Sequence, residues 1–300
     1  MAPSPGVPSA RQTWIALSVM FGAWLSSQFA VGIALMAYLL TTGKPLTQVA
    51  QVAMAPPVLA IGMVITVLAL LTPAIVLAQH WKLPLRFVFR LWPVPLLIYP
   101  CAALGMIAVG LLSSSLLTWL KPFVPSLLDP KLMGELGKSL QADTPAQLGF
   151  FFVLVALVPA TYEELVFRGF LQRGFESGYR PAAAIALSSA FFGLIHGDPF
   201  QGLGAMMLGG FLGFLAWRTG SLFPCMVAHA VQNGLFVLVN QLPETHLARD
   251  FDAQAPLWAV VTSAVVLAAS VAAIWRLMPS PAEPVIAPAI VEAPPLVLEL

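Results

Sequence analysis

The chain has 300 residues, of which 59% are hydrophobic and only 9% are charged, and its formal net charge is +1. A soluble domain carries about 25% charged residues, so this composition excludes an ordinary soluble protein and predicts a multi-spanning membrane protein. The balanced charge gives no indication of nucleic-acid binding. Cys101 and Cys225 both lie in apolar stretches, so we expect small buried residues there rather than a disulfide or a metal site.

The predicted elements are apolar helices, because a spanning helix needs about 20 mostly apolar residues. The sequence offers eight candidates, of which the fifth and sixth are short: 14–40, 55–79, 94–120, 147–167, 182–196, 202–217, 222–240 and 256–277. The expected fold is therefore an all-α polytopic membrane helical bundle with about eight transmembrane helices. The longest connection is expected to carry a short amphipathic helix near 131–140. No cleavable signal peptide is expected, because the first apolar stretch is long enough to span.

The two ends of the chain differ from this apolar region. Residues 1–13 and 279–300 are rich in Pro and Ala, and we expect both to be disordered. Residues 14–278 are then a single transmembrane domain, with a motif-bearing core at 147–240. Nine Lys and Arg residues fall on one side of the series of spans, Arg90 and Arg168 among them, and five on the other. The positive-inside rule thus predicts a multi-pass protein of the cell membrane with both termini in the cytoplasm.

Two adjacent carboxylates lie in the fourth apolar segment, in the sequence TYEELVFR at 161–168. Ionisable residues in membrane spans are costly, and they usually have a function. Glu164 and Arg168 are four residues apart, so they can pair on one helix face. Glu163 points about 100° away from Glu164. We therefore expect Glu164 to be structural and Glu163 to be free for chemistry.

Two further polar clusters follow, FFGLIHGD at 191–198 and HAVQN at 229–233. The turn at 178–181 lies midway between Glu163 and His196, so the two residues would be level in an antiparallel hairpin. His229 and Asn233 share a helix face and fall at a similar depth. If Arg168 marks the cytoplasmic edge, this level is about 10 Å below the surface, and 168–180 protrudes into the cytosol. The backbone at 197–199 would then be irregular at membrane depth, which is tolerated where it lines a cavity.

Three motifs occur in this order: Glu-Glu-x-x-x-Arg at 163–168, Phe-x-x-x-His at 192–196 and His-x-x-x-Asn at 229–233. Together they resemble the CPBP family, which comprises the CAAX proteases and the bacteriocin-processing or self-immunity proteins also called Abi proteins. The resemblance covers about 147–240, and the first 145 residues carry no recognised signature. It implies an intramembrane endopeptidase with about eight helices.

The resemblance also implies the roles of the site residues. Glu163 would activate a water molecule with help from His196, and His229 and Asn233 would form an oxyanion hole. Glu164, Arg168 and Phe192 complete the matching positions as structural support.

The residue types are compatible with this chemistry. No plausible serine or cysteine dyad is present, so an activated water is the simplest nucleophile. A sheltered carboxylate is a competent general base, and His and Asn side chains can donate hydrogen bonds to a developing oxyanion. We expect no cofactor. The alternative is a zinc site made by Glu163, His196 and His229, although the His-Glu-x-x-His signature is absent and Asn is a poor zinc ligand.

The expected partners are a peptide or protein substrate, which can itself be membrane-associated, and the lipid bilayer. Nucleic acid is not expected. Membrane His and Asn residues also join helices by hydrogen bonds, so a non-proteolytic scaffold or bacteriocin-immunity protein of the same fold is the rival interpretation. A transporter is a third, because carboxylates and broken helices also mark transporters.

Overall fold

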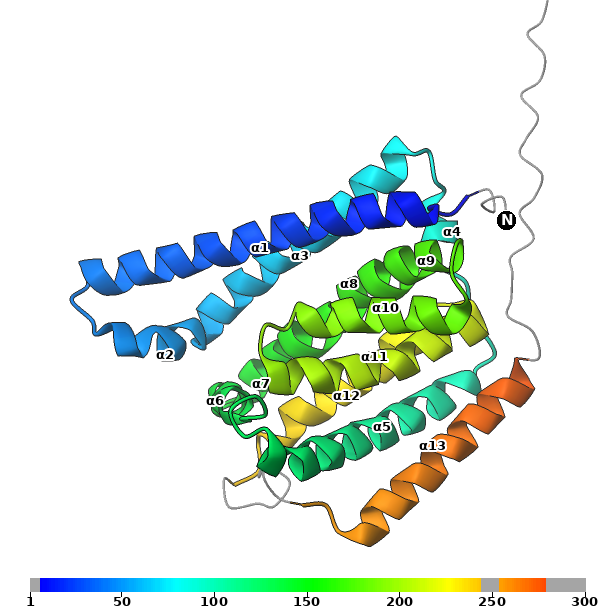
Figure 1. Cartoon of the computed structure of the whole chain (residues 1–300). Helices are drawn as coiled ribbons and strands as arrows, with labels where there is room; N and C mark the ends of the chain where they lie inside the picture. Colours follow the sequence, from blue (N-terminus) through cyan, green and yellow to red (C-terminus); the bar gives the residue numbers. More distant parts are fainter. Residues whose placement is uncertain (1–5, 244–253, 279–300) are drawn as a thin grey trace, which may run out of the picture.

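The computed structural model describes residues 6–243 and 254–278, and within them the secondary structure is helical with no strand (Figure 1). Six segments of this part are long and apolar enough to cross a membrane, and two further apolar helices are shorter. The long segments are Ala10–Thr41, Pro56–His80, Ile98–Phe123, Pro145–Glu176, Pro199–Thr219 and Leu257–Leu277. The short helices are Pro181–Leu194 and Phe223–Val239. These eight helices confirm the expected all-α polytopic bundle, and the chain is a multi-pass membrane protein.

The regular spans are α1 (Ala10–Thr41), α3 (Pro56–His80), α5 (Ile98–Leu120), α11 (Pro199–Thr219) and α13 (Leu257–Leu277). The connections carry shorter elements, namely η1 (Leu46–Gln48), α2 (Val49–Ala53), α4 (Leu85–Val88), η2 (Lys121–Phe123) and α6 (Lys131–Ser139). Helix α6 is the amphipathic helix that the sequence predicts near 131–140. Of the tails expected to be disordered, 1–5 and 279–300 lie outside the described residues, and α1 already begins at Ala10.

The fourth span is one long helix, Pro145–Glu176, which we call the central helix. It consists of α7 (Pro145–Phe151), a π-helical stretch η3 (Phe152–Leu157), α8 (Val158–Glu164), a second π-helical stretch η4 (Leu165–Gln172) and α9 (Arg173–Glu176). Such π-helical stretches inside α-helices are frequent at functional sites. The carboxylate pair lies at the junction between α8 and the second stretch.

The central helix continues well beyond the expected end at residue 167. Four polar side chains, spaced four residues apart, lie along it: Glu164, Arg168, Gln172 and Glu176. Arg168 and Gln172 are fully buried. Gln172 Nε2 donates to Glu176 Oε1 and to the Gly213 carbonyl, both at 2.9 Å. The expectation that 168–180 protrudes into the cytosol was therefore wrong for 168–176, which pack within the bundle, whereas 178–180 are exposed.

A second finding concerns Arg90 and Arg218, two of the nine cations counted on one side of the spans. Arg90 is 1% exposed and forms an ion pair with Glu176. Arg218 is buried as well, with its guanidinium 3.7 Å from the Trp275 ring centroid and a hydrogen bond of 3.0 Å from Nη2 to the Trp275 carbonyl. These two arginines are therefore paired within the protein rather than exposed to solvent.

The short helices are α10 (Pro181–Leu194) and α12 (Phe223–Val239). At 1.5 Å per residue, the 14 residues of α10 extend about 21 Å, less than the roughly 30 Å of a bilayer core. The sequence predicted short fifth and sixth spans, but the sixth, α11, has 21 residues. It is longer than expected because Asp198 caps its start by accepting a 2.8 Å hydrogen bond from Gln201 N.

Close packing of α10 on α11 is possible because glycines face each other. A Cβ atom on Gly193 would lie 2.5 Å from the Gly202 carbonyl oxygen, and one on Gly202 would lie 2.8 Å from the Gly193 carbonyl oxygen. Such a close approach at small residues is typical of helix packing within membranes. It also fixes the turn between the two helices, in which Gly197 adopts a φ of +72°.

The helices form a bundle around the central helix. Helix α5 packs against α11, α12 and α13, and the central helix contacts α10, α11 and α12. Helices α1 and α3 lie side by side as a long hairpin along one side of the bundle, and α13 lies along the opposite side (Figure 1). Their outer faces expose large apolar side chains such as Phe29, Ile33, Leu68 and Val265. Such faces suit contact with lipid rather than water.

Candidate active site

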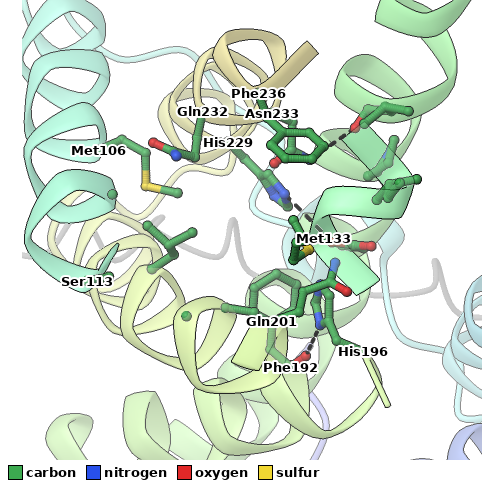
Figure 2. A pocket seen from close by; sticks show the side chains of 18 of the residues that line it. Met106, Ser113, Met133, Phe192, His196, Gln201, His229, Gln232, Asn233 and Phe236 are labelled. Atoms are coloured by element: carbon green, nitrogen blue, oxygen red, sulfur yellow. Dashed lines mark hydrogen bonds and ion pairs between the residues drawn. The ribbon is translucent and has the colours of Figure 1, made fainter. Parts of the chain in front are cut away.

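The four residues predicted to be catalytic line one cavity of about 420 Å³ inside the bundle. Glu163 comes from the central helix, His196 from the turn after α10, and His229 and Asn233 from α12. Figure 2 shows His229 and Asn233 on one wall of this cavity and His196 on another. A cavity of this size is within the range of small-ligand sites in proteins. The irregular backbone that the sequence predicted at 197–199 therefore adjoins a cavity, as required at membrane depth.

Glu164 is the fully buried centre of a charged cluster. Its Oε1 accepts a hydrogen bond of 3.0 Å from Arg168 Nη1 and another of 2.9 Å from His229 Nδ1. The predicted pairing of Glu164 with Arg168 is thus present, and His229 is an additional partner. A buried ion pair is tolerated only when further hydrogen bonds satisfy its polar atoms, and His229 provides one of them.

The bond to Glu164 fixes the protonation pattern of the His229 ring. A carboxylate oxygen can only accept, so the Nδ1 atom of His229 must carry a hydrogen. The other ring nitrogen, Nε2, lies 3.7 Å from Glu163 Oε2. His229 is therefore held between the two carboxylates, with Nε2 directed to the one that lines the cavity. An oriented histidine of this kind is a common component of hydrolytic sites.

Glu163 is 7% exposed and is less isolated than the sequence suggested. Tyr162 Oη donates a hydrogen bond of 2.8 Å to Glu163 Oε1. The second oxygen, Oε2, is the one nearest His229. The expectation that Glu163 has no partner was incomplete, because one oxygen is held by Tyr162. The other oxygen is available for a molecule in the cavity.

Phe192 lies at the contact between the charged cluster and the two histidines. The Arg168 guanidinium carbon is 4.2 Å from the Phe192 ring centroid, a cation–π distance. The same ring meets His196 edge to face at 5.1 Å and His229 at 5.9 Å between centroids. Phe192 thus packs between His196 and His229, so its predicted supporting position has a direct geometric basis.

His196 follows the last turn of α10, and its ring is fixed by a backbone contact. Nδ1 lies 2.8 Å from the Phe192 carbonyl oxygen, and a carbonyl accepts, so Nδ1 is the protonated nitrogen. In the neutral ring the lone pair is then on Nε2, which is the correct form for a base. Figure 2 shows this contact at the edge of the cavity, beside Gln201.

Asn233 connects α12 to the first π-helical stretch of the central helix. Its Nδ2 donates a hydrogen bond of 3.0 Å to the Val155 carbonyl oxygen. The amide group has two N–H donors, so this bond leaves one donor for a ligand in the cavity. The contact fixes the Asn233 side chain beside His229, one helical turn away on the same face.

Sequence reasoning missed two polar side chains of this site. Tyr162 precedes Glu163 directly, and neighbouring residues on a helix are not expected to face each other, so no pattern indicated its bond. Gln232 lines the cavity between His229 and Asn233. The signal available for Gln232 was its place within the HAVQN motif, one position before Asn233.

The zinc alternative would use the side chains of Glu163, His196 and His229 as metal ligands. In residues 6–243 and 254–278, no group of three His, Cys, Asp or Glu side chains is arranged to hold a metal ion. His229 Nδ1 is engaged by Glu164 and His196 Nδ1 by the Phe192 carbonyl. These contacts leave the Nε2 atoms of the two histidines and Glu163 Oε2 to face the cavity, and a histidine that binds a metal through Nε2 has the same kind of contact at Nδ1, so the zinc alternative is left to experiment. We therefore derive no step through zinc.

The comparison with known families agrees with this geometry. Residues 145–235 match a family described as "Type II CAAX prenyl endopeptidase Rce1-like". The range contains all seven motif residues from Glu163 to Asn233, and it confirms the resemblance to the CAAX proteases of the CPBP family. No curated protein and no solved structure matches the chain significantly. The match supports a peptide hydrolase of an intramembrane protease family.

Proposed function

We propose that this protein is an intramembrane endopeptidase that hydrolyses a peptide bond with a water molecule activated by Glu163. The observation that carries this proposal is the setting of Glu163. It is a buried carboxylate at a membrane cavity, with one oxygen bound by Tyr162 and the other facing His229. The match of residues 145–235 to a protease family supports the same reaction class.

The first step is attack by water on the substrate carbonyl. A water molecule between Glu163 Oε2 and His196 Nε2 would find two acceptors, so both of its hydrogens are held. Glu163 removes one proton as the oxygen bonds to the carbonyl carbon, and the carbonyl oxygen becomes an oxyanion. The proton on Glu163 then passes to the leaving amine as the carbon–nitrogen bond breaks, which regenerates the carboxylate.

The oxyanion is stabilised by the donors on α12. Asn233 contributes its second N–H, and His229 contributes Nε2–H in its doubly protonated form. That form carries positive charge between two carboxylates, Glu163 and Glu164, which lie on its two sides. A single oxyanion donor typically lowers a barrier by about 3 kcal/mol. Arg168 and Phe192 act indirectly, by holding Glu164 and the two histidine rings.

The cavity walls indicate the kind of peptide that enters. Beside the polar site the lining is mostly apolar, with Met63, Met106, Leu154, Leu208 and Phe236 among its residues. An apolar peptide segment fits such a lining, and it can reach the site from the bilayer or from the cytoplasmic side. We place both termini in the cytoplasm, following the positive-inside rule.

The central experiment compares the wild type with Glu163→Gln in lipid nanodiscs. The probes are internally quenched apolar peptides, with and without a prenylated CAAX end as named in the matched family. The exposed Glu135 of α6 offers a matched control, Glu135→Gln. We expect cleavage by the wild type and by Glu135→Gln, and none by Glu163→Gln with its melting temperature preserved. Equal cleavage by all three proteins would show that Glu163 is not the base.

The same proteins and peptides also test two alternative functions. The zinc-dependent version predicts that a strong chelator abolishes cleavage and that added zinc restores it, whereas the water mechanism predicts no effect. The rival scaffold or immunity function predicts that the wild type cleaves no peptide of the panel. It also predicts no difference in membrane-protein peptides between cells that carry the wild type and cells that carry Glu163→Gln.

A further inference from the structure

Gln232 is a polar side chain of the cavity that the reaction above does not use. It lies on α12, three residues after His229 and next to Asn233, and all three line the cavity. Figure 2 shows the Gln232 amide turned toward Met106 of α5, on the opposite side of His229 from Gln201 and His196. One face of α12 therefore presents the oxyanion donors and this amide to the same space.

The Gln232 amide makes no hydrogen bond with the described part of the protein. Its Oε1 is buried and has no partner, and no bond from its Nε2 to a described residue is present. A buried polar group without a partner costs about 1–3 kcal/mol, so such groups normally have an explanation. The described lining of the cavity includes apolar side chains such as Met106 and Leu208.

Helix α5 is shaped to leave this amide in place. Gly110 faces Gln232, and a Cβ atom at Gly110 would lie 2.5 Å from Gln232 Oε1 and 2.7 Å from Nε2. Any other residue at position 110 would push the amide away from its present position. The two helices thus accommodate an unpaired amide at the edge of the cavity instead of filling the space with apolar atoms.

We propose that Gln232 is a substrate-binding residue that pairs with the N–H and C=O groups of one extended substrate residue next to the scissile bond. This inference rests on the proposed peptidase function for its placement. An extended peptide brings N–H and C=O groups that need partners in an apolar cavity. A glutamine amide has both a donor and an acceptor, so Nε2 can donate to a substrate carbonyl while Oε1 accepts from a substrate N–H.

The chain offers a matched control in Gln241, near the end of the same helix. That amide is fully used inside the protein: Oε1 accepts from Ala142 N at 2.9 Å, and Nε2 donates to the carbonyls of Leu140 and Val237 at 2.8 and 2.9 Å. Gln241→Leu should therefore lower the melting temperature and leave peptide binding by the folded protein unchanged. Gln232→Leu should leave the melting temperature near the wild-type value and weaken peptide binding, because it removes no protein hydrogen bond.

The test measures KM and kcat of the full chain in nanodiscs for the best-cleaved peptide of the panel. For Gln232→Leu we expect a KM about tenfold higher, the equivalent of one or two net hydrogen bonds, with kcat changed less. Gly110→Ala, which displaces the amide, should raise KM in the same direction and serves as a second variant. In the substrate, replacing one amide N–H by an ester oxygen should weaken cleavage by the wild type but not by Gln232→Leu.

The outcomes separate this inference from the proposed function. If the wild type cleaves and both variants keep the wild-type KM, Gln232 does not bind the substrate, although the peptidase function stands. If no peptide is cleaved, binding of the fluorescent peptides is measured directly. Weaker binding by Gln232→Leu would then support the peptide site without the peptidase, and equal binding would overturn both.

Discussion

His229 and Glu164 are 65 residues apart in the chain, yet they are joined by a hydrogen bond of 2.9 Å between Nδ1 and Oε1. The same oxygen accepts from Arg168. Glu164 therefore links its ion pair with Arg168 to the orientation of the His229 ring. In the proposed reaction Glu164 acts through His229 rather than on the substrate, as a positioning residue.

Glu164→Gln tests this double role. The amide keeps an acceptor oxygen but removes the negative charge, so Arg168 is left buried without a counter-charge. Breaking a buried pair in this way costs about 3–5 kcal/mol, and we expect a clearly lower melting temperature. The Glu164→Gln protein that remains folded should also cleave peptide more slowly, because His229 is no longer held between two negative charges.

The control for this variant is Glu135→Gln, which removes an exposed carboxylate 3.7 Å from Lys138. Exposed pairs of this kind contribute below about 1 kcal/mol, so its melting temperature should stay at the wild-type value. A wild-type melting temperature for Glu164→Gln as well would contradict the structural role assigned to the pair.

Tyr162→Phe removes the hydrogen bond to Glu163 Oε1 and changes little else. A bond to a charged group contributes about 1.5–3 kcal/mol, and here it orients the proposed base. We expect kcat for the cleaved peptide to fall by about tenfold or more, and the melting temperature to fall by several degrees while the protein stays folded. The readout is steady-state cleavage in nanodiscs.

Tyr179→Phe is the matched control, because the Tyr179 hydroxyl contacts Trp14 Nε1 at 3.0 Å on the exposed end of the bundle. Its kcat should equal that of the wild type. An unchanged kcat for Tyr162→Phe would mean that Glu163 is oriented well enough by its remaining contacts, and that the tyrosine has no positioning role.

Gly193→Ala tests the close approach of α10 and α11. The added methyl group would lie 2.5 Å from the Gly202 carbonyl oxygen, and backbone atoms cannot turn aside as a flexible side chain can. Overpacking of this kind costs about 1–3 kcal/mol. We expect a lower melting temperature and reduced cleavage, since His196 follows directly after α10.

Gly210→Ala makes the same change on α11 at a position where nothing lies within 4 Å of the new atom. Alanine favours a helix over glycine by about 1 kcal/mol, so this variant should be as stable as the wild type or slightly more stable. If Gly193→Ala matched it in melting temperature and cleavage, the contact between the two helices would not be tight.

The sequence predicted those parts of the site that depend on local spacing. Glu164 and Arg168 are four residues apart, and one helix turn brings them together. The eight apolar helices follow from hydropathy alone. Counting residues on each side of the turn at 178–181 predicted that Glu163 and His196 lie at the same depth along the hairpin. Both residues line the same cavity.

The parts that were missed depend on contacts between distant segments. Neither the bond from His229 to Glu164 nor that from Asn233 to the Val155 carbonyl can be read from periodicity. The end of the central helix was placed too early for the same reason. Arg168 was taken as the cytoplasmic edge, because two of the groups that cover it, the Phe192 ring on α10 and Gly209 on α11, come from other helices.

The row of four polar side chains along the central helix also has a consequence for biosynthesis. In lipid alone, Glu164, Arg168, Gln172 and Glu176 would present a charged ridge to hydrocarbon. Two of the partners that complete it, Gly213 and His229, are translated later than the helix itself. The helix therefore cannot reach its final state as an independently inserted unit. Its stable placement in the bilayer has to wait for α11 and α12, so a chain that stops before α12 is expected to be recognised by the cell as unfinished.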